Sequence, residues 1–170
     1  DSGIRPSTAA RLLHWLRHSL RANTLSGSRK NIAYHYDLGN AFYERWLDST
    51  MTYSSAIYAM PDQSLDEAQR NKCRQLLDRM GATNDDHVLE IGCGWGGFAI
   101  LAAKERGVKI TGITLSQEQH DLAAARVQSE GLAERVRIEM RDYRDISETY
   151  DHVASIEMLE AVGERYWPVF

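Results

Sequence analysis

Cysteine and long apolar runs are scarce in this chain of 170 residues. It holds two cysteines, Cys73 and Cys93, and three prolines. Two cysteines are too few for a disulfide scaffold and lack metal-ligand spacing, so we expect no metal site and a reducing, cytoplasmic setting. No apolar run approaches the roughly 20 residues that span a bilayer, and no signal-peptide pattern opens the sequence. The sequence therefore predicts neither a membrane-spanning nor a secreted protein.

The charge is unevenly distributed. Residues 1–30 contain six basic residues and one acidic residue, a formal net charge of +5, whereas the rest of the chain contains 14 basic and 23 acidic residues. The acidic body disfavours a nucleic-acid binder, and the basic head predicts contact with an anionic partner. Residues 9–22 have the pattern of an amphipathic helix with leucines on one face. This helix either docks on the protein or lies on a membrane surface.

Helices and strands alternate from Ser64 onward. Ser64 and Glu67 form a capping box that predicts a helix ending near Gly81. Four strands are then expected, at residues 87–91, 108–114, 135–140 and 151–156. Helices at 97–106 and 117–130 separate the first three strands. This alternation predicts right-handed βαβ units, a parallel sheet and an α/β fold.

A glycine-rich loop follows the first predicted strand. It reads Glu90-Ile-Gly92-Cys93-Gly94-Trp95-Gly96-Gly97. Glycines let a ligand approach the backbone closely, and the next helix offers free N–H groups at its start. A dinucleotide site would place an acidic residue after the second strand, which here ends in Thr114-Leu-Ser116. A carboxylate at Glu90 would repel pyrophosphate but suits a cationic amino-acid group. The pattern favours S-adenosylmethionine over NAD; the alternative is a structural turn without a ligand.

Polar side chains follow the later strands. Asp142 and Tyr143 come directly after the third strand. There the Asp142 carboxylate can accept a hydrogen bond from an adenine amino group, and the Tyr143 ring can lie against the base. The alternative for Asp142 is a solvated position in a loop. Gln119 either contacts a ribose or completes a helix cap. Glu157 and Glu160 follow the fourth strand, where each is either a buried working carboxylate or a surface charge.

Six sequence blocks between residues 31 and 170 are specific when taken together. They are Tyr34-His-Tyr-Asp-Leu-Gly-Asn40, Met51-Thr-Tyr-Ser54, Val88-Leu-Glu-Ile-Gly-Cys-Gly-Trp-Gly-Gly97, Thr111-Gly-Ile-Thr-Leu-Ser-Gln-Glu-Gln119, Asp142-Tyr-Arg-Asp145 and Ser155-Ile-Glu-Met-Leu-Glu-Ala-Val-Gly163. In these blocks the chain resembles the cyclopropane-fatty-acid synthase family of S-adenosylmethionine-dependent methyltransferases. The resemblance implies a Rossmann-like class I methyltransferase sheet, of which the first four strands are present, with a helical aromatic N-terminal cap.

The resemblance also implies a reaction. A methyl group is transferred to the double bond of an unsaturated acyl chain of a phospholipid, and the carbocation loses a proton to bound bicarbonate as the cyclopropane ring closes. Glu90 already has a predicted cofactor-binding role. The family match assigns such a role also to Tyr53, Ser54, Gly92, Gly94, Thr114, Gln119, Asp142 and Tyr143.

The catalytic residues implied by the family are Glu160 and Ser55. Glu160 matches the bicarbonate-site glutamate, and Ser55 stands where members often have a cysteine that contributes its backbone N–H. Ala161 stands where the family usually has a histidine. These two differences leave ring closure, simple methylation and methylenation open.

The predicted organisation has three parts: a basic helix and linker at 1–30, a helical cap or lid at 31–81, and a partial cofactor-binding domain at 82–170. The family's sheet has seven strands, so a C-terminal half or another copy of the chain is expected to complete it. The expected partner is phospholipid at the inner face of the membrane. The alternatives are a methyltransferase of soluble small molecules and a cofactor-binding fragment without activity.

Overall fold

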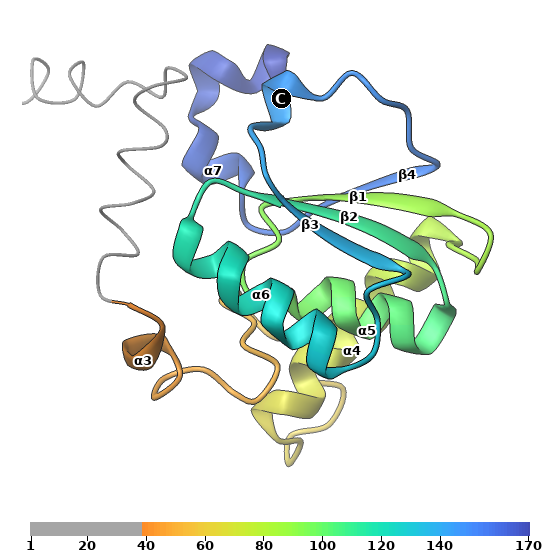
Figure 1. Cartoon of the computed structure of the whole chain (residues 1–170). Helices are drawn as coiled ribbons and strands as arrows, with labels where there is room; N and C mark the ends of the chain where they lie inside the picture. Colours follow the sequence, from red (N-terminus) through yellow and green to blue (C-terminus); the bar gives the residue numbers. More distant parts are fainter. Residues whose placement is uncertain (1–38) are drawn as a thin grey trace, which may run out of the picture.

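A four-stranded parallel sheet forms the centre of the computed structural model, which describes residues 39–170 (Figure 1). The strands are β1 (His87–Ile91), β2 (Lys109–Thr114), β3 (Val136–Met140) and β4 (His152–Ser155), in the order β3-β2-β1-β4. The predicted strands and their parallel pairing are confirmed, with each strand end within one residue of its expected place. The helix predicted at 9–22 and the rest of 1–38 lie outside the described residues.

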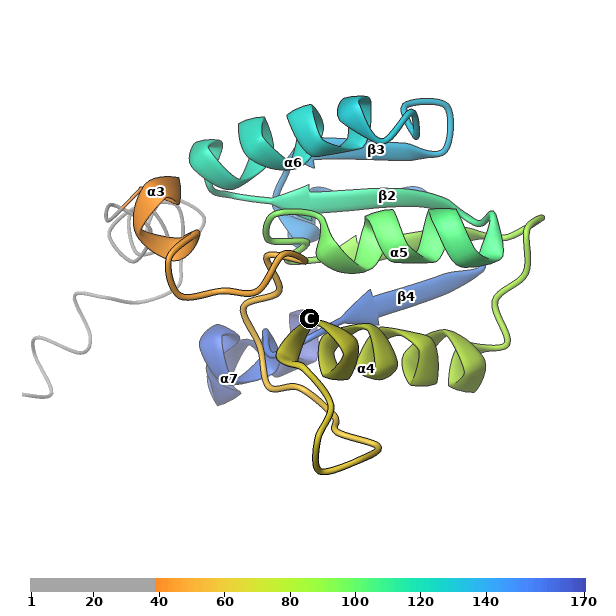
Figure 2. The ribbon, with the colours of Figure 1, turned by 90° about the horizontal axis from the view of Figure 1, so that it is seen from below.

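Three helices cover one face of the sheet. They are α4 (Leu65–Met80), α5 (Gly97–Arg106) and α6 (Gln117–Ser129), and they lie side by side in the view from below (Figure 2). Val88, Ile110 and Val136 are in register across β1, β2 and β3 and are buried beneath these helices. Burial of this apolar layer is the main favourable contribution to folding in the described part of the chain.

The opposite face is covered by irregular segments. Leu89, Ile91 and Ile113 point away from the three helices and form a separate buried cluster. The side chains packed on them come from the loop around η1 (Tyr143–Asp145), from residues after β4 and from the end of η2 (Glu164–Val169). The sheet is therefore enclosed on both faces, as a parallel sheet requires.

The capping signals predicted the ends of α4 correctly. The Ser64 hydroxyl accepts from the Glu67 backbone N–H, and the Glu67 carboxylate accepts from the Ser64 N–H. Gly81 ends the helix in the left-handed conformation, with φ of 67°. Cys73 and Leu77 of α4 belong to the main core, so this helix packs with the sheet domain.

The strand order reverses beside β1. The chain moves outward from β1 to β2 and β3 through α5 and α6, then returns to place β4 on the other side of β1. In open parallel sheets the ligand crevice lies outside the carboxyl ends of the strands at such a reversal. The fold therefore places a crevice where β1 and β4 end.

Strand β4 offers a free edge within the described residues, where it pairs with β1 alone and leaves Val153 57% exposed. An edge with unpaired backbone groups and an apolar side chain promotes pairing with another strand. We expect the 170-residue chain, studied alone, to dimerise or aggregate, and Val153→Lys to weaken this association in sedimentation experiments. Val169→Lys is the control, because Val169 is equally apolar and exposed but lies in η2. A clean monomer at high concentration would contradict the prediction.

Candidate active site

An extended segment, Thr52–Ile57, crosses the carboxyl-end edge of the sheet; we call it the strap. It follows α3 (Asn40–Tyr43) and its succeeding turns and precedes α4. Its first part lies at the glycine loop, since the rings of Tyr53 and Trp95 are 6.5 Å apart. Its middle reaches the end of β4, where the Ser55 N–H donates to Glu157 Oε1 at 2.8 Å. The strap thus spans the crevice that the topology places there.

Side chains of α4 hold the strap by its backbone. Gln69 Nε2 donates to the carbonyls of Thr52 and Ser54, at 3.3 and 2.7 Å. Lys72 Nζ donates to the Ser55 carbonyl at 3.0 Å and also contacts the Ser54 hydroxyl. These bonds fix the register of the strap on the helix.

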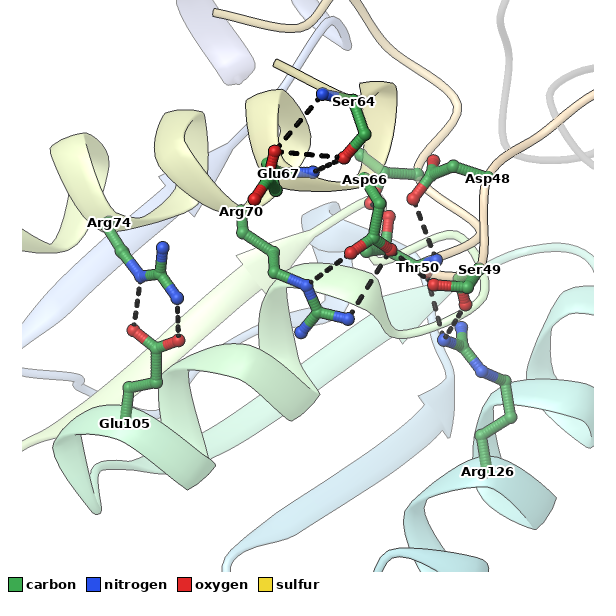
Figure 3. A network of polar contacts seen from close by, with 11 residues as sticks. Asp48, Ser49, Thr50, Ser64, Asp66, Glu67, Arg70, Arg74, Glu105 and Arg126 are labelled. Atoms are coloured by element: carbon green, nitrogen blue, oxygen red, sulfur yellow. Dashed lines mark hydrogen bonds and ion pairs between the residues drawn. The ribbon is translucent and has the colours of Figure 1, made fainter. Parts of the chain in front are cut away.

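The base of the strap is tied to α4 and α6 by the polar network of Figure 3. Arg126 of α6 donates to the carbonyls of Ser49 and Thr50, and the Asp48 carboxylate accepts from the Thr50 N–H. Asp66 of α4 pairs with Arg70 and accepts from the Ser49 hydroxyl. A cavity of about 270 Å³ lies beside this network, lined by residues of α4, α5 and α6 and by Thr52 of the strap.

Gly97 shows how closely the strap approaches α5. A Cβ atom built at Gly97 would lie 2.5 Å from Thr52 Oγ1 and 2.8 Å from the Thr50 carbonyl. Any side chain at this position would push the strap off the first turn of the helix. The last glycine of the loop is therefore required by packing as well as by any ligand.

Gly92 and Gly94, both predicted to line the cofactor, differ in their surroundings. Both have positive φ, 78° and 54°. A Cβ at Gly92 would lie 2.5 Å from Met158 Sδ, whereas the described residues place no atom within 4 Å of one at Gly94, its chain neighbours aside. Gly94 thus faces open space, and Gly92 lies beneath the Met158 side chain.

Trp95 fastens the glycine loop to the N-terminal segment. Its side chain is 1% exposed, and its Nε1 donates to Asn40 Oδ1 at 2.7 Å. Its ring lies 4.9 Å from that of Tyr43, which in turn lies 5.4 Å from the ring of Tyr53. These rings form one wall beside the loop, and they place the predicted cofactor residue Tyr53 there.

Glu90 is a buried carboxyl group immediately below the loop. It is 4% exposed, it faces the helical layer, and its Oε2 has no hydrogen-bond partner among residues 39–170. Burial raises the pKa of Glu90 to about 8, against a smaller lowering effect of the Ala99 backbone N–H at the start of α5. An unsatisfied carboxyl oxygen in the interior opposes folding, and such groups gather at functional sites.

Thr114, the last residue of β2, lies beside Gln119 in the first turn of α6. The Thr114 hydroxyl donates to Gln119 Oε1 at 2.8 Å, and both residues are buried. The Ser116 hydroxyl caps α6 by accepting from the Gln119 backbone N–H at 3.3 Å, so Gln119 takes part in the cap through its backbone, while its side chain bonds Thr114. Its contact with a ribose stays a prediction.

Asp142 is buried after β3 rather than solvated. The Arg144 guanidinium forms a bidentate ion pair with its carboxylate, with Nε 2.8 Å from Oδ1 and Nη2 2.6 Å from Oδ2. The neighbouring Tyr143 ring lies 4.9 Å from that of Phe170, and burial raises the Tyr143 pKa. The ion pair fixes the Asp142 side chain, and the contact of these residues with adenine stays a prediction.

The two glutamates after β4 lie differently. Glu157 adopts a left-handed backbone with φ of 52° and bonds the Ser55 N–H, the same group that the family match assigns to the bicarbonate site. Glu160 is exposed on the short helix α7 (Leu159–Val162). The structure brings Ser55 together with Glu157, and the role of Glu160 stays a prediction.

Sequence reasoning missed Gln69 and Lys72, the α4 residues that hold the strap. A glutamine and a lysine on an amphipathic helix are normally read as solvent-facing. The available signal was their spacing of three residues beside Ala68 and Cys73, which places them next to the buried stripe.

Both thiols are buried. Burial raises the pKa of Cys73 to about 11 and that of Cys93 well above its ordinary value. Residues 39–170 contain no cluster of three His, Cys, Asp or Glu side chains placed to hold a metal ion. Over the same range, no helix is both long and apolar enough to cross a membrane.

Comparison with known proteins gives consistent matches. The family model described as mycolic acid cyclopropane synthetase matches residues 24–170. Tuberculostearic acid methyltransferase UfaA1 of Mycobacterium tuberculosis is 46% identical over 93% of this chain, and the cyclopropane-fatty-acyl-phospholipid synthase of Escherichia coli is 38% identical over 80%. The chain spans only 40% and 34% of the lengths of these two relatives.

Solved structures agree with the fold. The crystal structure of mycolic acid cyclopropane synthase CmaA1 complexed with SAH and CTAB superposes with a TM-score of 0.78 at 30% identity. The match covers 81% of this chain and 48% of that one. The predicted Rossmann-like methyltransferase sheet is thereby confirmed.

The buried carboxyl of Glu90 makes stability depend on pH. Its folded pKa of about 8 exceeds the ordinary 4.5, so its contribution is fully present below pH 4.5 and is lost as pH rises through about 8. We expect Glu90→Gln to raise the unfolding midpoint more at pH 8 than at pH 5, through a gain of roughly 4 kcal/mol at most.

Glu105→Gln is the control for this comparison. The pKa of Glu105 is lowered by its hydrogen bond from Arg74, so its contribution is present above its ordinary pKa and is lost on acidification. This variant should gain no stability between pH 5 and pH 8. Equal effects of Glu90→Gln at both pH values in thermal unfolding would show that the Glu90 pKa is not raised.

Proposed function

Since this chain belongs to the mycolic acid cyclopropane synthetase family, we propose that it forms the cofactor-binding part of an S-adenosylmethionine-dependent methyltransferase of lipid acyl chains. The acceptor is the double bond of an unsaturated chain in a phospholipid. S-adenosylmethionine supplies the methyl group, and bicarbonate is the proposed proton acceptor. The names of the two relatives refer to fatty acyl products, which supports this substrate class.

The observation that carries the proposal is the glycine loop at the end of β1. Gly94 leaves open space for close approach of a ligand, and the carboxyl of Glu90 lies immediately below. Its Oε2, which lacks a partner in the described part of the chain, fits a cofactor whose amino-acid part carries positive charge, because nearby positive charge stabilises the ionised carboxylate.

Other residues around the crevice have distinct proposed tasks. Tyr53 and the wall of rings exclude water from the cofactor side, and Ser54 on the strap contributes a hydroxyl. Thr114 and Gln119 would meet the ribose and Asp142 the adenine, from the ends of β2 and β3. Ser55 and Glu160 would hold the proton acceptor near the end of β4, where the acceptor would share the Ser55 N–H with Glu157.

We also propose a peripheral location at the inner, cytoplasmic face of the membrane, with phospholipid as partner. The excess of basic residues in 1–30 supports attraction to anionic lipid. A C-terminal half or a second copy would complete the sheet beside β4.

Gly94→Val tests the cofactor loop. A Cβ at this position has no atom of the described residues within 4 Å apart from its chain neighbours, so the valine side chain would fill the space that the cofactor needs. We expect calorimetry to show S-adenosylmethionine affinity reduced at least tenfold. Gly131→Val is the matched control, because Gly131 also has positive φ (67°) and open surroundings but lies at the end of α6, so it carries the same backbone strain. Equal affinities of the two variants would mean that the loop is structural.

Glu160→Gln tests the acyl-chain chemistry in the complete protein. Gln is nearly isosteric but neutral, so cofactor affinity should persist while turnover falls roughly 100-fold or more. Mass spectrometry of lipids from expressing cells reports the product: a gain of CH₂ per chain supports the proposal, and a gain of CH₃ plus hydrogen indicates reductive methylation. Unchanged turnover in the variant would remove Glu160 from the site, and unmodified lipids with a modified soluble acceptor would favour a small-molecule methyltransferase.

A further inference from the structure

The backbone of Ser55 is held through both its N–H and its carbonyl. Its N–H donates to Glu157 Oε1 at 2.8 Å, and its carbonyl accepts from Lys72 Nζ at 3.0 Å. Lys72 comes from α4 and Glu157 from the loop after β4, so the two groups reach the strap from different elements. An acidic and a basic side chain therefore bond the backbone of the same residue, in the middle of the strap.

Lys72 is an unusual lysine because its side chain is buried. Burial lowers its pKa, while the charges of Glu157 and Asp48 act in the opposite direction. A buried ammonium group is costly unless it is hydrogen-bonded and has opposite charge nearby. Its partners are all on or next to the strap, which indicates that the lysine is retained to hold the strap.

The backbone is strained just before the strap and at Glu157, the residue that bonds its middle. Met51, just before the strap, and Glu157, its partner after β4, are the two non-glycine residues with positive φ within the described range, at 54° and 52°. Such conformations cost free energy and persist where the surroundings determine them, most often at functional sites. The strap is thus held in place against local conformational preference.

We propose that Lys72 and Glu157 form a clamp on the Ser55 backbone that positions the strap over the cofactor crevice. Lys72 is a positioning residue, since it acts through Ser54 and Ser55. Glu157 closes the crevice between the strap and β4. The inference rests on the proposed methyltransferase function and extends it to two residues that set the geometry of the site.

The first test is Lys72→Met in the complete protein. Met keeps the length of the side chain but cannot donate to the strap, so the dissociation constant of S-adenosylmethionine should rise and kcat at saturating cofactor should fall, each roughly tenfold or more. The unfolding temperature should change little, because removal of the buried charge offsets the loss of the hydrogen bonds from Lys72 to the strap. Lys104→Met is the matched control: Lys104 pairs with Glu130 between α5 and α6, away from the strap.

The second test is Glu157→Ala, a change at an exposed side chain that the fold tolerates. Hydrogen exchange of the strap amides should accelerate, and Glu157→Gln, whose carbonyl still accepts from the Ser55 N–H, should restore slow exchange and most of kcat. These readouts separate positioning from a general loss of stability.

The outcomes separate the clamp from the proposed function. If the parent protein neither binds S-adenosylmethionine nor turns over, the proposed function fails. If the parent binds and turns over, while Lys72→Met and Glu157→Ala keep parental affinity, kcat and exchange rates, the clamp is wrong. A lower unfolding temperature with unchanged affinity and kcat would also overturn it, because the two residues would then be structural only.

Discussion

An extended segment without a neighbouring strand must find hydrogen bonds for its own backbone, and this constraint organises the site. The strap has no strand partner in the described part of the chain. Side chains of α4 donate hydrogen bonds to its carbonyl groups instead. These hydrogen bonds require polar residues next to the apolar stripe of α4. It also requires Gly97 at the start of α5, where the strap passes too closely for any side chain. The packing of helix, loop and strap is therefore one solution to the need to satisfy the partly buried backbone groups of the strap.

Two buried ionisable groups border the crevice, and burial acts on them in opposite directions. It raises the pKa of Glu90 and lowers that of Lys72, so both are shifted toward their neutral forms. Lys72 recovers part of this cost through the strap and Glu157. The unpartnered oxygen of Glu90 has no such compensation from the described protein atoms, and this asymmetry suits a site that receives a cationic ligand.

The regular part of the fold could be predicted from the sequence, because its signals are local. Capping at Ser64 and Ser116, glycines at helix ends and short apolar strands all depend on near neighbours in the chain. The glycine loop was also readable, since its place between strand and helix is local. The partnership of Ser55 with Glu157 was not, because it joins residues 102 positions apart and depends on which side of β1 receives β4. Nor could the sequence reveal that Arg144 holds Asp142, or that Met158 covers Gly92.

The two cysteines give the molecule an unexpected chemical property. Only the thiolate form attacks disulfides and alkylating reagents, and burial keeps Cys73 and Cys93 protonated and out of reach. The folded domain should thus be inert toward oxidants and thiol reagents despite carrying two free sulfhydryls. Cys73 lies between α4 and the sheet core, and Cys93 lies in the glycine loop, so each becomes reactive only when its own neighbourhood opens. The labelling rate of Cys73 consequently measures how often the helical layer opens, and the labelling rate of Cys93 measures how often the glycine loop opens. Neither measurement needs an added probe.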